Sequence, residues 1–279
     1  MAPSIKSVFT AYTEEGQGKQ DSALGYALSL AQQAAAHLTV QAAAMRYTIP
    51  ASLVGDFGVA FVQAENRRID TLAERFAELA KTSAALAGVN STIETPRLVY
   101  SELGDRLVSH ARVHDLSVLD AEKNAAERDR GLIEAALFES GRPVIIVPPG
   151  SETFAAGRIL IAWDGSAGAA RTVAEARPFL KGAEVEILSV TGEKDLSRLI
   201  AGAELAPHLS RHGAAVTVRN VAVSGGNDVA ETIRQAAADF GADLIVCGAY
   251  KHSRLREWLL GGVTQSLLKS TPLPLLMSR

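Results

Sequence analysis

The residues best suited to chemistry form one glycine-rich stretch late in the sequence, GAYKHSRLREWLLGGVT, from Gly248 to Thr264. It follows the apolar run ADLIVC, so the pattern predicts a buried strand that ends at Gly248 and a helix that begins after Gly261 and Gly262. The first N–H groups of a helix have no intrahelical partner and carry the positive end of the helix dipole. Glycines adopt positive φ angles freely and let a ligand approach the main chain. The stretch therefore predicts a phosphate site, although glycines that only shape tight turns remain an alternative on spacing alone.

The elements that would position this site are short apolar strands that alternate with amphipathic helices. Strands are expected in the first half at residues 4–13, 38–45, 91–100, 116–120 and 142–149, and in the second half at 157–165, 183–190, 215–223, 242–248 and 272–278. Helices are expected at 21–37, 56–87, 104–115, 124–140, 169–180, 195–213 and 227–241, with a last one ending near Ser270. Asp21 or Ser22 would cap the first helix, and Gly213 would follow the end of another.

The two halves follow one plan, which suggests an internal duplication. HDLSVLD, residues 114–120, echoes ADLIVCG, residues 242–248, and the Pro/Gly-rich segment PPGSETFAAG separates the halves. We predict domains at residues 1–150 and 157–279. Each would be a doubly wound α/β domain with a parallel five-stranded sheet, and a pseudo-two-fold axis would relate the two. In such folds a ligand binds outside the carboxyl ends of the strands.

The composition argues against several classes of function. The 279 residues carry a net charge of −3 and no basic cluster, so neither nucleic acid nor an anionic membrane is expected as a partner. The single cysteine, Cys247, excludes a disulfide framework and is expected to be an inert core thiol. The N-terminus lacks a signal-peptide pattern and no apolar stretch is long enough to span a bilayer, so a cytoplasmic protein is expected. The histidine pairs His110/His114 and His208/His212 have no further metal ligands in a recognisable pattern, so no metal site is predicted.

Two motifs resemble the universal stress protein family: AWDGSAGAARTV after the strand at Ile159–Ile161, and DLIVCGAYKHSRLREWLLGGVTQSLLKSTPLPLL. Two copies in one chain resemble the tandem members of that family. The resemblance implies a Rossmann-like fold of the adenine nucleotide alpha hydrolase type and a site for ATP or a related adenine nucleotide, with or without Mg²⁺. It implies that Asp164 meets the adenine and that Val190 lines the same pocket. By the same resemblance Gly248, Gly261, Gly262, Val263 and Thr264 would face ribose and phosphates. Apart from the resemblance, the residue types of Lys251 and Ser253 add donors near the predicted phosphate site, and His252 is expected within reach of it.

The sequence departs from the family's nucleotide motif at two positions. Lys251 replaces the second glycine, and Gly262 replaces a serine or threonine. Gly262 keeps its N–H and loses a hydroxyl, which removes one hydrogen bond worth about 1 kcal/mol. Lys251 would either fill the phosphate site or pair with a phosphate as a point charge. The sequence leaves both alternatives open.

The first copy keeps few residues of the nucleotide motif. Asp120 stands where Gly248 stands in the second copy, and Tyr12 and Thr13 replace Asp164 and its neighbour. Carboxylates follow at Glu122, Glu127 and Asp129, so we predict that this half binds no nucleotide. Its role would be structural: the last strands of the two halves would pair within one chain, as an intramolecular pseudo-dimer. A homodimer of the whole chain stays open.

Three functions are consistent with these residues. The first is a stress-response protein that binds adenine nucleotide in its second half as a regulatory ligand, with at most slow ATP hydrolysis or self-phosphorylation and no dedicated catalytic residue. The second is a nucleotide-free scaffold that acts through contacts with protein partners not yet identified. The third is an adenylating enzyme on a related fold, which the missing pyrophosphate-loop motif disfavours.

Overall fold

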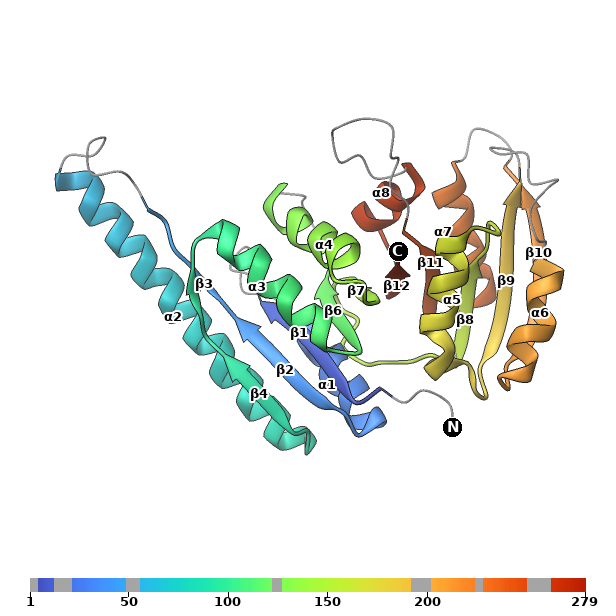
Figure 1. Cartoon of the computed structure of the whole chain (residues 1–279), viewed down its shortest axis with the longest axis horizontal. Helices are drawn as coiled ribbons and strands as arrows, with labels where there is room; N and C mark the ends of the chain where they lie inside the picture. The colour runs from blue at the N-terminus through green and yellow to red at the C-terminus, as the bar shows by residue number, and fades with distance from the viewer. Residues whose placement is uncertain are drawn as a thin grey trace.

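The structure is a computed structural model that describes residues 5–12, 22–48, 56–121, 127–191, 202–223, 228–249 and 262–279. It is built around one ten-stranded sheet (Figure 1). The first half contributes β1 (Ser7–Tyr12), β2 (His37–Ala42), β4 (Ser91–Glu94), β6 (Leu116–Asp120) and β7 (Val144–Val147). The second half contributes β8 (Arg158–Ala162), β9 (Glu184–Thr191), β10 (Ala215–Ala222), β11 (Leu244–Gly248) and β12 (Leu275–Ser278).

The strand order repeats, which confirms the doubly wound plan of both halves. The sheet runs β10-β9-β8-β11-β12-β7-β6-β1-β2-β4, so within each half the third strand lies at the outer edge and the first strand beside the fourth. Neighbouring strands are parallel within each half. The point where the strand order reverses therefore lies between β1 and β6 in one half and between β8 and β11 in the other.

The two halves meet through their last strands. β7 and β12 pair antiparallel, with Ile146 opposite Leu275 and Val144 opposite Met277. The expected pairing of the last strands is confirmed. The two five-stranded sheets are thus continuous rather than separate, and an antiparallel junction between halves of equal strand order relates them by a pseudo-two-fold rotation.

Helices cover both faces of the sheet, and side chains from successive strand residues enter the two layers alternately. One face is covered by α1 (Ser22–Ala34), α2 (Asp56–Ala87), α5 (Ala167–Leu180) and α6 (Gly202–Arg211). The other is covered by α3 (Tyr100–Val113), α4 (Glu127–Glu139), α7 (Val229–Phe240) and α8 (Gly262–Lys269). Both hydrophobic clusters contain residues of both halves, so the core passes through the junction without a break. No described helix has the length and apolarity needed to cross a bilayer.

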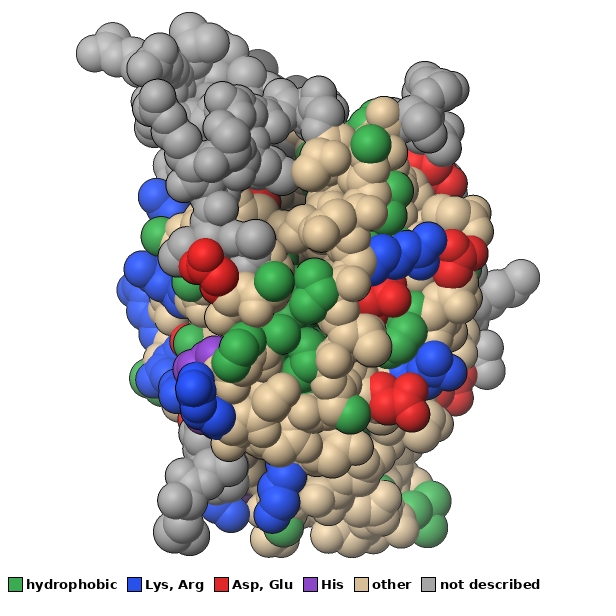
Figure 2. All heavy atoms as spheres, turned by 90° about the vertical axis from the view of Figure 1, so that its right-hand side faces the viewer, with side chains coloured by type: hydrophobic (Ala, Val, Ile, Leu, Met, Phe, Trp, Pro, Cys, Tyr) green, Lys and Arg blue, Asp and Glu red, His purple; other side chains and the backbone are tan. Residues whose placement is uncertain are grey.

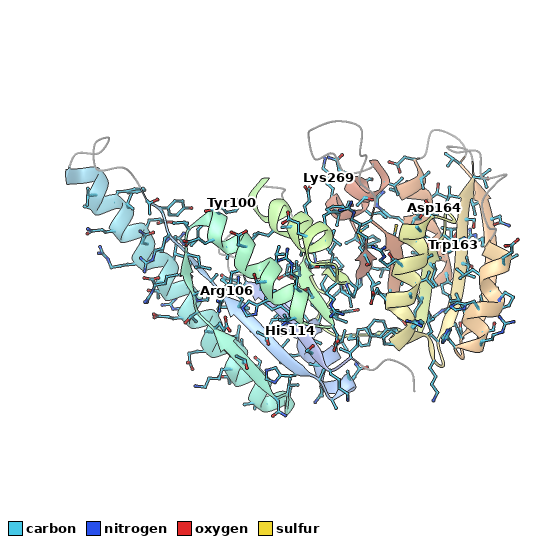
Figure 3. The ribbon with its side chains drawn as sticks, viewed as in Figure 1. Tyr100, Arg106, His114, Trp163, Asp164 and Lys269 are labelled. Atoms are coloured by element: carbon cyan, nitrogen blue, oxygen red, sulfur yellow. The ribbon has the colours of Figure 1, made fainter. Side chains whose placement is uncertain are left out.

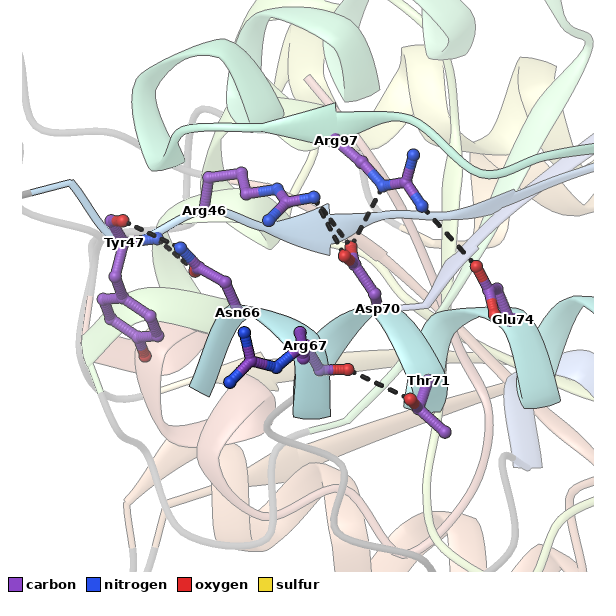
Figure 4. A network of polar contacts seen from close by, with 8 residues as sticks. All are labelled: Arg46, Tyr47, Asn66, Arg67, Asp70, Thr71, Glu74 and Arg97. Carbon is purple, nitrogen blue, oxygen red and sulfur yellow. Dashed lines mark hydrogen bonds and ion pairs between the residues drawn. The ribbon is translucent and has the colours of Figure 1, made fainter. Parts of the chain in front are cut away.

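α2 continues past the sheet, where it meets a small ribbon that the sequence did not predict. β3 (Ala44–Met45) and β5 (Arg97–Leu98) form this ribbon. Asp70 of α2 accepts hydrogen bonds from Arg46 at 2.9 Å and from Arg97 at 3.1 Å (Figure 4). Asn66 of the same helix bonds the main chain of Tyr47 through both its amide oxygen and nitrogen. These polar contacts hold the ribbon on α2 together with a small apolar cluster of Ala44, Ile69 and Ala73.

Candidate functional site

Three of the predicted site residues lie together at the carboxyl edge of the second half. Asp164 follows β8, Val190 is near the end of β9, and Gly248 ends β11. The register that pairs Ala162 with Leu188 and with Cys247 places Val190 and Gly248 beside Asp164. Figure 3 shows Asp164 at this edge, next to Trp163. The three neighbouring strands therefore bring these residues to the switch point predicted for a ligand.

Asp164 and Ser166 build the turn that begins α5. Gly165 has a φ of 73°, so a glycine is needed between them. The Ser166 N–H donates to Asp164 Oδ1 at 3.1 Å, and Ser166 Oγ accepts from the Ala169 N–H at 3.1 Å as the N-cap. Sequence reasoning missed this role of Ser166, although a serine directly before a helical pattern is a recognised signal for a cap. The turn fixes the position of the Asp164 carboxylate relative to α5.

Gly248 is required for a different reason than the one expected. Its φ is not positive; the described glycines with positive φ lie elsewhere. A Cβ at Gly248 would lie 2.9 Å from Ala169 N, 3.1 Å from Gly168 C and 3.2 Å from Ala169 Cα. The expectation of a left-handed turn is therefore wrong. The main chain that approaches Gly248 is the N-terminus of α5, which sits directly on the end of β11.

The first turn of α8 contains the other described site residues. Gly262 is exposed, and a Cβ there would meet no atom of the described part of the chain within 4 Å. Val263 packs against the same hydrophobic cluster as Val190, and Thr264 is buried. Lys251, His252, Ser253 and Gly261 lie outside the described residues, so their predicted contacts are neither supported nor contradicted.

Comparison with known proteins identifies the second half. Residues 156–279 match the universal stress protein family. We call this matched segment the universal stress domain. The whole chain resembles a universal stress protein from Archaeoglobus fulgidus DSM 4304, with 14% identity over 98% of both chains and a TM-score of 0.64. It also resembles a putative universal stress protein from Pseudomonas aeruginosa UCBPP-PA14, with 14% identity over 98% of this chain and 93% of that one and a TM-score of 0.53. No curated protein sequence matches the chain.

Cys247 lies under the site of the universal stress domain and does not take part in its chemistry. Burial raises the pKa of its thiol to about 12, with a smaller contribution from the negative charge of Asp164. A thiol with this pKa stays protonated at neutral pH, so it is a poor nucleophile and metal ligand. The prediction that Cys247 lies in a buried strand is confirmed.

In the first half an aspartate, Asp120, stands at the position that corresponds to Gly248. Asp120 ends β6 as Gly248 ends β11, and its Oδ1 accepts a hydrogen bond of 2.8 Å from the Ala23 N–H. Ala23 lies in the first turn of α1, the helix that corresponds to α5. In the universal stress domain the end of the strand carries no side chain and touches the helix N-terminus directly. In the first half a carboxylate lies between the two.

Two aromatic side chains further distinguish the first half. Tyr12, at the end of β1, stacks on Phe76 of α2 with ring centroids 4.0 Å apart. A Cβ at Gly131 of α4 would lie 2.8 Å from the hydroxyl of Tyr100, which begins α3. At Gly262 of α8, by contrast, no side chain among the described residues comes within 4 Å of a Cβ. Among the described residues no group of three His, Cys, Asp or Glu side chains could hold a metal ion.

Proposed function

We propose that the universal stress domain binds ATP or a related adenine nucleotide at the carboxyl edge of β8, β9 and β11, as a regulatory ligand in a stress response. The observation that carries this proposal is the pair of glycines on opposite sides of the edge. Gly248 brings β11 onto the start of α5, and Gly262 begins α8 with no atom of the described residues within 4 Å of a Cβ. The described residues thus leave room for a ligand at Gly262, whereas Gly248 is buried and lets α5 lie against the end of β11.

Each described residue then has a role that its chemistry permits. The Asp164 carboxylate accepts a hydrogen bond from the adenine amino group, while its turn with Ser166 keeps it in place. Val190 contributes apolar contact to the base. The N–H groups at the start of α8 bind phosphate, favoured by the positive end of the helix dipole. Lys251, His252, Ser253 and Gly261 complete the site in this proposal.

The first half is proposed to bind no nucleotide. Asp120 already supplies the α1 N-terminus with a negative charge at 2.8 Å. Since Asp120 stands where Gly248 stands in the proposed site, a nucleotide at this edge of the first half would bring its phosphates towards this carboxylate, and like charges repel. The expected stoichiometry is therefore one nucleotide per chain.

Calorimetric titration of the nucleotide-stripped protein with ATP and Mg²⁺ tests the proposal. One site per chain is expected, with weaker binding in Asp164→Ala and unchanged binding in the matched variant Asp120→Asn. The variant Lys251→Gly reports whether the lysine holds phosphate, in which case binding weakens, or blocks it, in which case binding strengthens. If neither the wild type nor Lys251→Gly releases or absorbs heat of binding up to millimolar ATP, the proposal fails and the nucleotide-free scaffold function replaces it.

A further inference from the structure

Within the segments that the structure describes, no strand pairs with the outer edge of β10, which is longer than the opposite edge of the same sheet. β10 spans eight residues, all exposed or half-exposed, and its central Val218 is 38% exposed. At the other end of the sheet β4 spans four residues, and Pro96 follows it two positions later. Glu94 of β4 is also covered by Arg106 and His110 of α3, at 2.5 and 3.1 Å. Since the halves share one plan, β4 serves as an internal reference for β10.

β10 lacks the features that usually prevent edge strands from pairing. Proteins protect such edges with lysine, proline, bulges or short strands. β10 has no proline and no lysine, and it pairs with β9 in register along its whole length. Its single charged residue, Arg219, turns away from the edge to Asp239 of α7 at 3.0 Å and to Glu186 of β9 at 3.8 Å. In the view of this side of the molecule, apolar side chains gather in the middle of the face between charged ones (Figure 2).

The hydrogen-bond pattern shows which main-chain groups the edge presents. Ala215 N donates to Ala183 O at 2.9 Å, and Val223 N donates to Thr191 O at 2.8 Å. Odd-numbered residues therefore face β9. Because N–H and C=O groups alternate along a strand, those of residues 216, 218, 220 and 222 point to the outer edge.

We propose that β10 pairs antiparallel with β10 of a second copy of this chain, so that two ten-stranded sheets become one. A two-fold axis perpendicular to the sheet keeps equal faces together and places Val218 opposite its own copy. Residue 216 then lies opposite residue 220, and both partners present their N–H and C=O groups to each other. The chain already joins its two halves by antiparallel pairing of edge strands, β7 with β12, and the new contact repeats that geometry on the same sheet.

Charge and length select this register over its neighbours. Centred on Val218, the pairing covers residues 215–221 and places Arg219 opposite Thr217 of the other copy. A shift of one step in one direction centres the axis on Arg219 and brings two guanidinium groups together, which is unfavourable. A shift in the other direction centres it on Thr217 and shortens the paired segment to 215–219. The partner is therefore a second copy in a single register.

A cysteine scan tests both the pairing and its register. In the proposed register the Cα atoms of residue 218 and its copy are about 5.5 Å apart, within the range of a disulfide. Val218→Cys should form a disulfide-linked dimer under mild oxidation. Thr217→Cys should not, because residue 217 reaches its copy only diagonally, over about 7–8 Å. The native Cys247 is buried, so the background is low. Equal cross-linking of both variants, or of neither, would overturn the register.

Sedimentation analysis of the full chain measures the association itself. We expect a species of twice the 29.4 kDa chain mass, and conversion to monomer in Val218→Pro. Proline at 218 removes an N–H that points outward and leaves the bonds to β9 intact. Val113→Lys, which alters a valine that is 73% exposed on α3, is the matched control and should stay dimeric, whereas Val218→Lys should be monomeric. A wild type that is monomeric at all concentrations, or a dimer unchanged by Val218→Pro, refutes the proposal. None of these outcomes depends on nucleotide binding.

Discussion

Substitution of Gly248 by alanine should destabilise the protein, whereas the same substitution at Gly262 should not. At Gly248 the new Cβ would lie 2.9–3.2 Å from three main-chain atoms of α5. Ordinary contacts of a Cβ begin near 3.4 Å, and main-chain atoms of a helix cannot rotate away as the end of a side chain can. At Gly262 the Cβ meets no atom within 4 Å in the segments that the structure describes.

The magnitude follows from the comparison of the two variants. Glycine-to-alanine substitution restricts the unfolded chain and by itself stabilises a protein by about 0.4–1 kcal/mol. This gain is common to both variants and cancels in their difference. Overpacking of a tight site costs about 1–3 kcal/mol, so Gly248→Ala should be less stable than Gly262→Ala by that amount.

Urea denaturation followed by circular dichroism measures this difference. With a slope near 3 kcal/mol per molar urea, the midpoint of Gly248→Ala should lie roughly 0.3–1 M below that of Gly262→Ala, at equal slopes. Because the displaced segment of α5 carries the cap Ser166, Gly248→Ala should also weaken nucleotide binding. Equal midpoints would show that α5 is not seated rigidly on β11, and the explanation given for Gly248 would fail.

Three further predictions concern other parts of the chain. Asp120→Ala should destabilise the first half by about 0.5–2 kcal/mol through loss of the hydrogen bond to the α1 N-terminus. Asp120→Asn should retain most of the stability. Thermal unfolding of the two variants shows whether the Asp120 side chain stabilises the start of α1. Asp70→Ala should release the β3–β5 ribbon from α2 and speed amide exchange at Ala44 and Arg46, whereas Glu74→Ala, which loses one ion pair of 3.5 Å at an exposed site, should change exchange little. Burial, followed by the nearby charges of His212, Arg177 and Arg211, lowers the pKa of His208 below 6.5, so the unfolded chain binds the proton more tightly. The stability that neutral His208 contributes is present above pH 6.5 and is lost as the pH falls through the folded pKa. His208→Gln should therefore flatten the dependence of the unfolding free energy on pH in that window. Arg177→Gln should raise the pKa of His208 in an NMR titration.

The strands and helices could largely be predicted from the sequence because the hydrophobic periodicity of the strands differs clearly from that of the helices in both halves. Short apolar runs such as those at β7 and β11 alternate with amphipathic segments, and the expected bounds of α2, 56–87, agree with the observed helix. Gly213 has the predicted positive φ, at 89°, after the end of α6. The described part of α6 begins at Gly202, while its expected start at Asp195 lies outside the described residues.

The contacts that the sequence did not reveal depend on residues far apart in the chain. The ribbon of β3 and β5 is held by Asp70. Each of its strands has only two residues, which is too short for a periodic pattern in the sequence. The closeness of Gly248 to Ala169 and the bond from Ala23 to Asp120 connect residues about 80 and 100 positions apart. A single sequence indicates that a glycine or a carboxylate ends a strand. It does not indicate which helix N-terminus will lie against that strand.

The antiparallel junction of β7 and β12 has a consequence for synthesis of the protein. Ile146 lies beside Leu275, about 130 positions later in the chain, and β12 also separates β7 from β11. At about 5–20 residues per second, a ribosome needs roughly 6–25 s to make the intervening chain. During this time the apolar edge of β7 has been made but its partner has not. The edge of β7 therefore stays unpaired in the nascent chain until β12 has been made. A chaperone that binds β7 during translation should increase the yield of folded protein more than one that acts after release.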